Sequence, residues 1–218
     1  MKTIFPFALL CLLLPLLNSC ASLSGFHTGR TVEEGNGEIL LSLNLASAPD
    51  FSDDEDDILQ DVFFANIEFG GRFGITEKLD AGIRVNSVLN VLMDVKYQVA
   101  GDKQSPFAMS LGGGVGTFSL ISAEGSLFNF QVPVYTSYHP SENIGIYFSP
   151  RYIGQFGTDF SETIDYLSYL GANTGLEIGK GNVRFGLDFG YYYLSGDDTG
   201  LDTSRLLQFG MGMKFIID

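Results

Sequence analysis

Ten segments of this chain alternate between apolar and polar residues, and this period of two constrains the fold more than any other feature. Successive side chains of a β-strand point to opposite faces, so each segment is expected to be a strand with one apolar and one polar face. The expected strands are 38–46, 63–73, 79–85, 91–99, 107–117, 128–138, 144–153, 169–178, 183–193 and 209–217. No stretch has the pattern of a long amphipathic helix, so the sequence predicts an all-β fold.

The formal charges of the ten segments all fall on the polar face. That face carries six acids and six bases, namely Glu38, Glu68, Asp80, Asp94, Glu177, Asp188, Arg72, Arg84, Lys96, Arg151, Arg184 and Lys214. A charged side chain that faces lipid at mid-membrane costs about 2–4 kcal/mol for Arg or Lys. The distribution therefore predicts an antiparallel, up-and-down transmembrane β-barrel with a lipid-facing outside and a polar lumen.

A soluble, lipocalin-like barrel also alternates, but its apolar face points inward. Its outer face is normally rich in charged residues and Thr. Here the polar face is instead rich in glycine and tyrosine, at Gly70, 82, 112, 114, 116, 145, 171, 175, 186, 190, 210 and 212 and at Tyr135, Tyr147, Tyr169 and Tyr192. Small residues beside large aromatics suit a confined, curved interior. A periplasmic lipid-binding lipoprotein of lipocalin type stays the second alternative.

The connections between the segments alternate in length. Those near residues 75, 100, 139 and 180 are short, and those at 47–61, 119–126, 154–165 and 194–205 are longer; only 86–90 breaks the rule. Outer-membrane barrels have short periplasmic turns and longer outer loops. We expect about ten strands, within a range of eight to twelve. An even number returns the C-terminus to the side on which the first strand begins, and a lipid anchor on the preceding segment is expected on that same side.

The N-terminus has the pattern of a secretory leader. Lys2 is followed by an apolar run over residues 4–17, which is short for a membrane span and contains two prolines. The run ends in Leu17-Asn18-Ser19-Cys20, which resembles a bacterial lipobox. The resemblance implies removal of residues 1–19 and acylation of Cys20, with palmitate among the acyl chains. Ordinary signal cleavage is the alternative.

The remaining chain is expected to have two parts, a lipidated tether over residues 20–37 and the barrel over residues 38–218. The tether lacks any periodic pattern. Cys11 lies in the leader and Cys20 is the lipid site, so the barrel has no cysteine for a disulfide or a metal thiolate site.

The polar-face charges predict a mostly closed lumen. Eight strands leave an interior just filled by side chains, whereas sixteen enclose an aqueous channel. In a ten-stranded barrel, acids and bases can pair across the lumen, and the expected network is Glu68, Arg72, Asp80, Arg84, Asp94, Lys96, Arg151, Glu177, Arg184, Asp188 and Lys214. A narrow channel or transporter for small solutes is the alternative, because the luminal glycines leave room.

Nothing in the sequence indicates catalysis. His27 lies in the tether and His139 in a short turn, whereas the outer-membrane proteases and lipases of this architecture need a His at the outer rim. We therefore expect a monomer without enzyme activity or cofactor, and the net charge of −14 argues against nucleic acid as a partner. The long connections are acidic, with candidate ligands for divalent cations or for lipopolysaccharide contacts at Asp53, Asp54, Asp56 and Asp57.

From Glu38 to the end, the chain resembles small outer-membrane β-barrel proteins of the OmpA/OmpX type. The resemblance rests on the ten alternating segments and on phrases such as Phe73-Gly74-Ile75-Thr76-Glu77-Lys78-Leu79-Asp80-Ala81-Gly82. It implies the outer membrane of a Gram-negative-type bacterium and a structural or surface-interaction role through the outer loops. Such barrels usually end on an aromatic residue, whereas this chain ends Phe215-Ile216-Ile217-Asp218.

Overall fold

The structure, a computed structural model, describes residues 23–48, 62–87, 89–119, 125–159, 166–196 and 205–218. It contains ten strands: β1 (Gly37–Ala48), β2 (Val62–Thr76), β3 (Leu79–Asn86), β4 (Asn90–Ala100), β5 (Phe107–Ser119), β6 (Gly125–Ser141), β7 (Ile144–Asp159), β8 (Tyr166–Lys180), β9 (Val183–Gly196) and β10 (Arg205–Ile217). They confirm the ten strands expected from the sequence, most of them extended by a few residues. The described residues include no helix long and apolar enough to cross a membrane.

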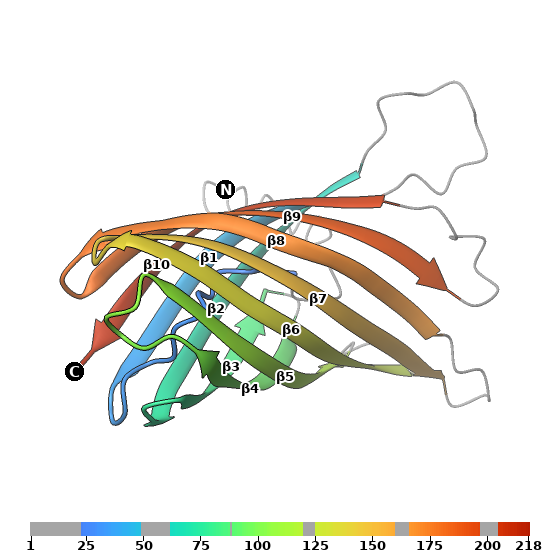
Figure 1. The fold of residues 1–218 in the computed structure, drawn as a ribbon. Coiled ribbons are helices and arrows are strands. Elements are labelled where there is room, and N and C mark those ends of the chain that lie inside the picture. The colour runs from blue at the N-terminus through green and yellow to red at the C-terminus, as the bar shows by residue number, and fades with distance from the viewer. Residues whose placement is uncertain (1–22, 49–61, 88, 120–124, 160–165, 197–204) are drawn as a thin grey trace, which may run out of the picture.

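Each strand pairs antiparallel with its neighbours in sequence, and β1 pairs with β10 to close the barrel (Figure 1). The seam runs from Gly37 opposite Ile217 to Ser47 opposite Leu207. The start of β1 and the end of β10 therefore lie together, at the end of the barrel where the short turns are found. This end is called the turn end, and the opposite one, where the strands run into the long connections, is called the loop end.

Two of the short turns depend on glycine. Gly101 follows β4 and Gly181 follows β8, and their φ angles of 80° and 63° lie in the left-handed region that side chains with a Cβ rarely adopt. Such residues let the chain reverse within a few positions, which keeps the turn end compact.

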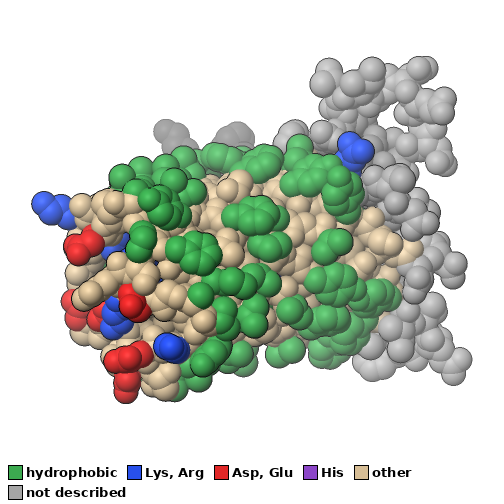
Figure 2. Space-filling view, viewed as in Figure 1, with side chains coloured by type: hydrophobic (Ala, Val, Ile, Leu, Met, Phe, Trp, Pro, Cys, Tyr) green, Lys and Arg blue, Asp and Glu red, His purple; other side chains and the backbone are tan. Residues whose placement is uncertain are grey.

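The outside of the barrel is apolar. Large hydrophobic side chains are exposed along every strand; Val115 and Leu170, for example, are 66% and 62% exposed. Figure 2 shows these side chains spread over the barrel wall, while most of the visible charged groups gather at the turn end. The predicted orientation of the apolar face is confirmed, and the lipocalin-like alternative, which needs that face inside, does not fit.

The inside is polar and filled, and its glycines accommodate large neighbours. A Cβ on Gly112 would lie 2.8 Å from the ring of Tyr135, and one on Gly175 would collide with the hydroxyl end of Tyr147. Near the loop end an apolar cluster lies in the lumen, made up of Leu23, Ala46, Ile153, Tyr169, Tyr192, Leu194 and Leu206. The pairing of small residues with large aromatics is thus the packing of a closed interior.

The segment that precedes β1 lies in the lumen. The sequence predicted a tether between lipid and barrel over residues 20–37, but the structure places Leu23 to Gly29 among the buried residues, followed by Arg30 to Val32 at intermediate exposure. We call residues 23–32 the luminal strap. Figure 1 shows it in blue, inside the ring of strands. Residues 33–36 then cross to the start of β1.

Candidate functional site

The luminal strap runs from the loop end to the turn end. Leu23 belongs to the apolar cluster near the loop end, together with Leu194 and Leu206. At the other extremity, the backbone N–H of Val32 donates to Asp80 at 2.9 Å, close to the short turn between β2 and β3. The strap thus follows the lumen along its axis.

Glycines in the strap and glycines on the inner wall of the barrel allow the strap to fit in the lumen. A Cβ on Gly25 would collide with the side chain of Asn173, and a Cβ on Gly29 would collide with the backbone carbonyl of Ala108. Between them, the ring of Phe26 is 2% exposed and lies against the wall glycines Gly186, Gly210 and Gly212. The room that these wall glycines leave is occupied by the strap.

One group of buried ion pairs lines the wall formed by β2, β3 and β4. Arg72 bridges Asp80 and Asp94. Arg84 lies 3.6 Å from both Glu68 and Asp94, and Lys96 lies 3.4 Å from Asp80. All six side chains are almost fully buried. Each charge is therefore close to at least one opposite charge.

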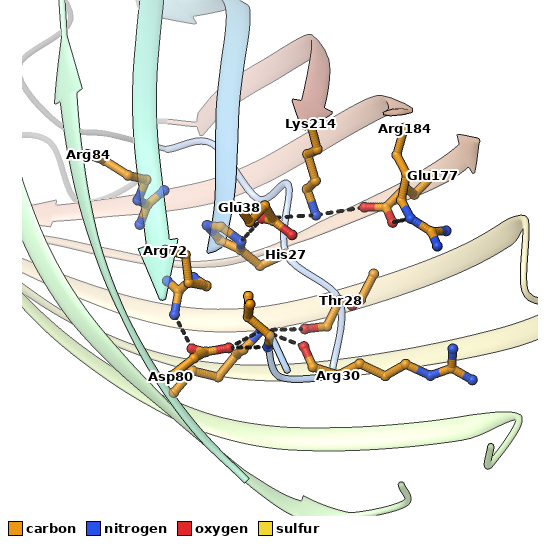
Figure 3. Close-up of polar contacts among 12 residues, drawn as sticks. His27, Thr28, Arg30, Glu38, Arg72, Asp80, Arg84, Glu177, Arg184 and Lys214 are labelled. Atoms are coloured by element: carbon orange, nitrogen blue, oxygen red, sulfur yellow. Dashed lines mark hydrogen bonds and ion pairs between the residues drawn. The ribbon is translucent and has the colours of Figure 1, made fainter. Parts of the chain in front are cut away.

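A second group of ion pairs lies closer to the turn end, on β1, β8, β9 and β10. The Lys214 ammonium is 2.6 Å from Glu177 and 3.7 Å from Glu38, and Arg184 is 3.7 Å from Glu177 (Figure 3). The imidazole of His27, on the strap, is 4.0 Å from Glu38. Figure 3 shows that this group faces the Arg72–Asp80 pair across the strap.

Two buried charges of the expected network have no opposite charge within 4.0 Å among the described residues, and each of them is hydrogen-bonded to the strap. The guanidinium of Arg151 donates to the carbonyl oxygen of Ser24 at 3.0 Å. The carboxylate of Asp188 accepts from the backbone N–H of Gly25 at 3.0 Å and from the Tyr147 hydroxyl at 2.8 Å. An unsatisfied buried charge is costly, so these bonds make the strap part of the network.

The strap also binds the paired charges. The Ser24 hydroxyl donates to Glu68 at 2.5 Å. The Lys96 ammonium donates to the carbonyl oxygens of Thr28 and Arg30, at 3.3 and 2.6 Å. Most of these contacts use backbone groups of the strap. The structure therefore brings nine of the eleven expected network residues together as ion pairs, and the strap hydrogen-bonds to the group on β2, β3 and β4.

The strap and the uncharged residues that hold it were not predicted from the sequence. The amide of Asn173 donates to the carbonyl of Leu23 at 3.0 Å, and Gln98 accepts from the N–H and the hydroxyl of Thr31 at 3.0 and 2.9 Å. His27, expected in a tether outside the barrel, is 4% exposed within the lumen. The sequence carried a signal only in Gly25 and Gly29, on either side of residues 26–28, and two such glycines are too common to single out a buried segment.

Open space in the lumen is found at the turn end. A cleft of about 500 Å³ there is lined by the strap and by charged side chains such as Arg30, Glu33, Lys103, Glu142 and Arg184. Further inside, the gap between His27, Arg72 and Arg84 has only about 10 Å³, which is about the space of one water molecule. The strap thus forms the floor of a vestibule.

Two sets of predicted sites are not covered by the described residues. Cys20 and the acidic candidates Asp53, Asp54, Asp56 and Asp57 lie outside them. Within the described part of the chain, no group of three or more His, Cys, Asp or Glu side chains is arranged to hold a metal ion.

These features define a class: a closed, ten-stranded antiparallel β-barrel with an apolar outside and a polar inside, whose lumen contains residues 23–32 of its own chain. No family model and no curated protein sequence matches the chain. Among solved structures it is similar to neisserial surface protein A, at 12% identity and a TM-score of 0.41, over 84% of this chain and 99% of the other. It is also similar to the outer membrane protease OmpT from Escherichia coli (8%, 0.42, 91% and 100%) and to the outer membrane protein OprG from Pseudomonas aeruginosa (10%, 0.38, 88% and 99%).

Proposed function

We propose that this protein is an outer-membrane lipoprotein whose barrel is closed by its own strap and which acts through the surface formed by its long loops. The observation that carries the proposal is the strap, whose backbone binds Arg151, Asp188, Lys96 and Asp80 and whose Ser24 hydroxyl binds Glu68. A segment hydrogen-bonded to buried charges along most of its length supports a permanent plug.

The membrane location is supported by the distribution of charge. The exposed belt is built from Leu, Ile, Val, Phe and Met, and the charges of the strand interiors lie in the lumen. Turning a luminal Arg or Lys outward would cost about 2–4 kcal/mol at the bilayer midplane, whereas the apolar belt gains by leaving water. Among bacterial membranes, closed barrels with short turns at one end and long loops at the other are typical of the outer membrane.

A role for the loops follows from the closed lumen. If solutes do not pass through the barrel, the parts free to meet other molecules are its two ends. The loop end carries the acidic residues at 50–61, 159–165 and 197–202, and clustered carboxylates favour hard divalent cations. We propose contacts with lipopolysaccharide, bridged by such cations, or with other cell-surface partners.

The vestibule at the turn end favours a second candidate, a narrow channel for small solutes. Its cleft of about 500 Å³ is wide enough to admit small molecules. Conduction would then need the strap to leave the lumen, because its contacts reach from Leu23 to Val32.

Conductance in a planar bilayer separates the two candidates. The full-length protein should insert without steady current, whereas a variant that lacks residues 23–32 and still folds should conduct, because the strap's volume becomes water. Steady current through the wild-type protein would overturn the plugged barrel and favour the channel. Gly71→Ala serves as the control, since a Cβ at this outward position meets nothing within 4 Å.

A further inference from the structure

The direction of the strap determines where the chain before it can lie. Leu23 lies in the apolar cluster with Leu194, and Leu194 is two residues from the end of β9 at the loop end. Ten residues of β9 separate Leu194 from Arg184, which lines the vestibule at the turn end. At a rise of about 3.3 Å per residue and a tilt of about 40°, this separation is about 25 Å along the barrel axis.

Cys20 is only three residues before Leu23. A chain of three residues spans at most about 10 Å even when fully extended. This reach is less than half of the distance from Leu23 to the turn end, and the way back through the lumen is filled by the strap itself. The short covalent connection therefore restricts Cys20 to the neighbourhood of the loop end.

This restriction conflicts with the position expected from strand parity. β1 begins at the turn end, as Gly37 opposite Ile217 shows, and a simple tether on β1 would place a lipid anchor on that side. Because the chain passes through the lumen before it enters β1, the two ends of the strap lie on opposite sides of the barrel. The side of β1 and the side of Cys20 are thus different.

We infer that the strap threads the barrel so that Cys20 and its acyl groups are displayed at the loop end, in the outer leaflet of the outer membrane. The inference rests on the proposed function for the outward orientation of the loop end and for acylation of Cys20. The barrel then acts as the conduit for its own N-terminus, and the turn end, with its vestibule, is left free of lipid on the periplasmic side.

Thiol accessibility in intact cells tests this inference. An acylated Cys20 has no free thiol and Cys11 is removed with the leader, so a single introduced cysteine reports its own side of the membrane. The probe variant is Ser22→Cys, which lies next to the strap. Its controls are Asp198→Cys, in the long connection between β9 and β10, and Asn182→Cys, an exposed residue of the short turn between β8 and β9.

We expect a membrane-impermeant maleimide to label Ser22→Cys and Asp198→Cys on intact cells, and Asn182→Cys only after the outer membrane is permeabilised. If the controls behave this way but Ser22→Cys is labelled only after permeabilisation or denaturation, the inference is wrong and the proposed function still stands. If Asn182→Cys is labelled from outside and Asp198→Cys is not, the proposed orientation fails and surface display fails with it. Heat-modifiable migration on gels shows that each variant has folded.

Discussion

The contact between Phe26 and Gly186 offers the sharpest test of the strap's position. The Phe26 ring is 2% exposed, and truncation of a buried Phe to Ala costs about 3–5 kcal/mol. A Cβ on Gly186 would lie 2.9 Å from Cδ1 of Phe26, so Gly186→Ala should crowd the ring and cost about 1–3 kcal/mol. Both single variants are expected to lower the free energy of unfolding.

The double variant is where the structure makes a distinctive prediction. The nearest atom to the added methyl group outside the Phe26 ring is the carbonyl oxygen of Leu176, at 3.8 Å. Without the ring, the methyl group of Gly186→Ala therefore has room and fills part of the cavity that Phe26→Ala leaves. We expect the two changes to be non-additive, with the double variant more stable than the sum of the single effects by about 1–3 kcal/mol.

Urea unfolding in detergent micelles measures this coupling. The chain has no tryptophan, so far-UV circular dichroism should follow the loss of strands, and gel mobility should give the folded fraction independently. Gly71→Ala, which faces outward with open space around it, should change the free energy of unfolding by less than about 0.5 kcal/mol. Additive effects of Phe26→Ala and Gly186→Ala would show that the strap does not occupy this place in the folded protein.

Three further predictions address the network, the outer face and the anchor. Arg72→Ala should lower the free energy of unfolding by about 3–5 kcal/mol, because it leaves the carboxylates of Asp80 and Asp94 buried without this guanidinium. Lys103→Ala breaks an exposed pair with Glu33 at 3.2 Å and should cost less than about 1 kcal/mol. Similar unfolding midpoints in urea for the two variants would contradict this contrast. Val95→Arg should reduce membrane assembly, because an Arg on the exposed apolar face costs about 2–4 kcal/mol in the bilayer. Gln104→Arg lies in an exposed turn and should assemble normally. The heat-modifiable fraction in isolated membranes measures assembly of both variants. Cys20→Ser should abolish incorporation of labelled palmitate, and unchanged incorporation would remove the lipoprotein interpretation.

The strands and their outward faces could be predicted because each rests on a rule that acts at every position. A period of two identifies a strand, and the cost of a charge in lipid decides which face points outward. The luminal glycines could be interpreted for a similar reason, since a residue such as Gly175 is needed wherever a ring such as Tyr147 crosses a narrow interior.

The strap could not be predicted, because it binds through groups that every residue has. The carbonyl oxygens of Ser24, Thr28 and Arg30 accept bonds from wall cations, and the backbone N–H groups of Gly25 and Val32 donate to wall carboxylates. No side-chain pattern marks such a segment. Composition alone made residues 20–37 look like a solvated tether.

The pairing of acids with bases in the charge network also could not be predicted from the sequence. The polar face of a strand could be assigned, but not which acid meets which base, since long side chains reach diagonally across the register. Arg72 lies opposite Gly82 in the pairing of β2 with β3, yet its guanidinium contacts Asp80 and Asp94. The small residue opposite leaves the space for that reach: a Cβ on Gly82 would lie 2.9 Å from an Arg72 nitrogen.

A strap bonded to most of the surrounding strands also constrains the order in which the barrel is assembled. Each strand from β2 to β9 makes a hydrogen bond to it, so we expect the growing sheet to curl around the strap before the seam between β1 and β10 closes. Because residues 23–29 are buried along the lumen, we do not expect the strap to be threaded through a barrel that has already closed. The strap would then act as an internal template around which the strands of the barrel assemble. A barrel closed without residues 23–32 should therefore not regain its stability when the same residues are added later as a free peptide, and recovery on addition would show that threading can follow closure.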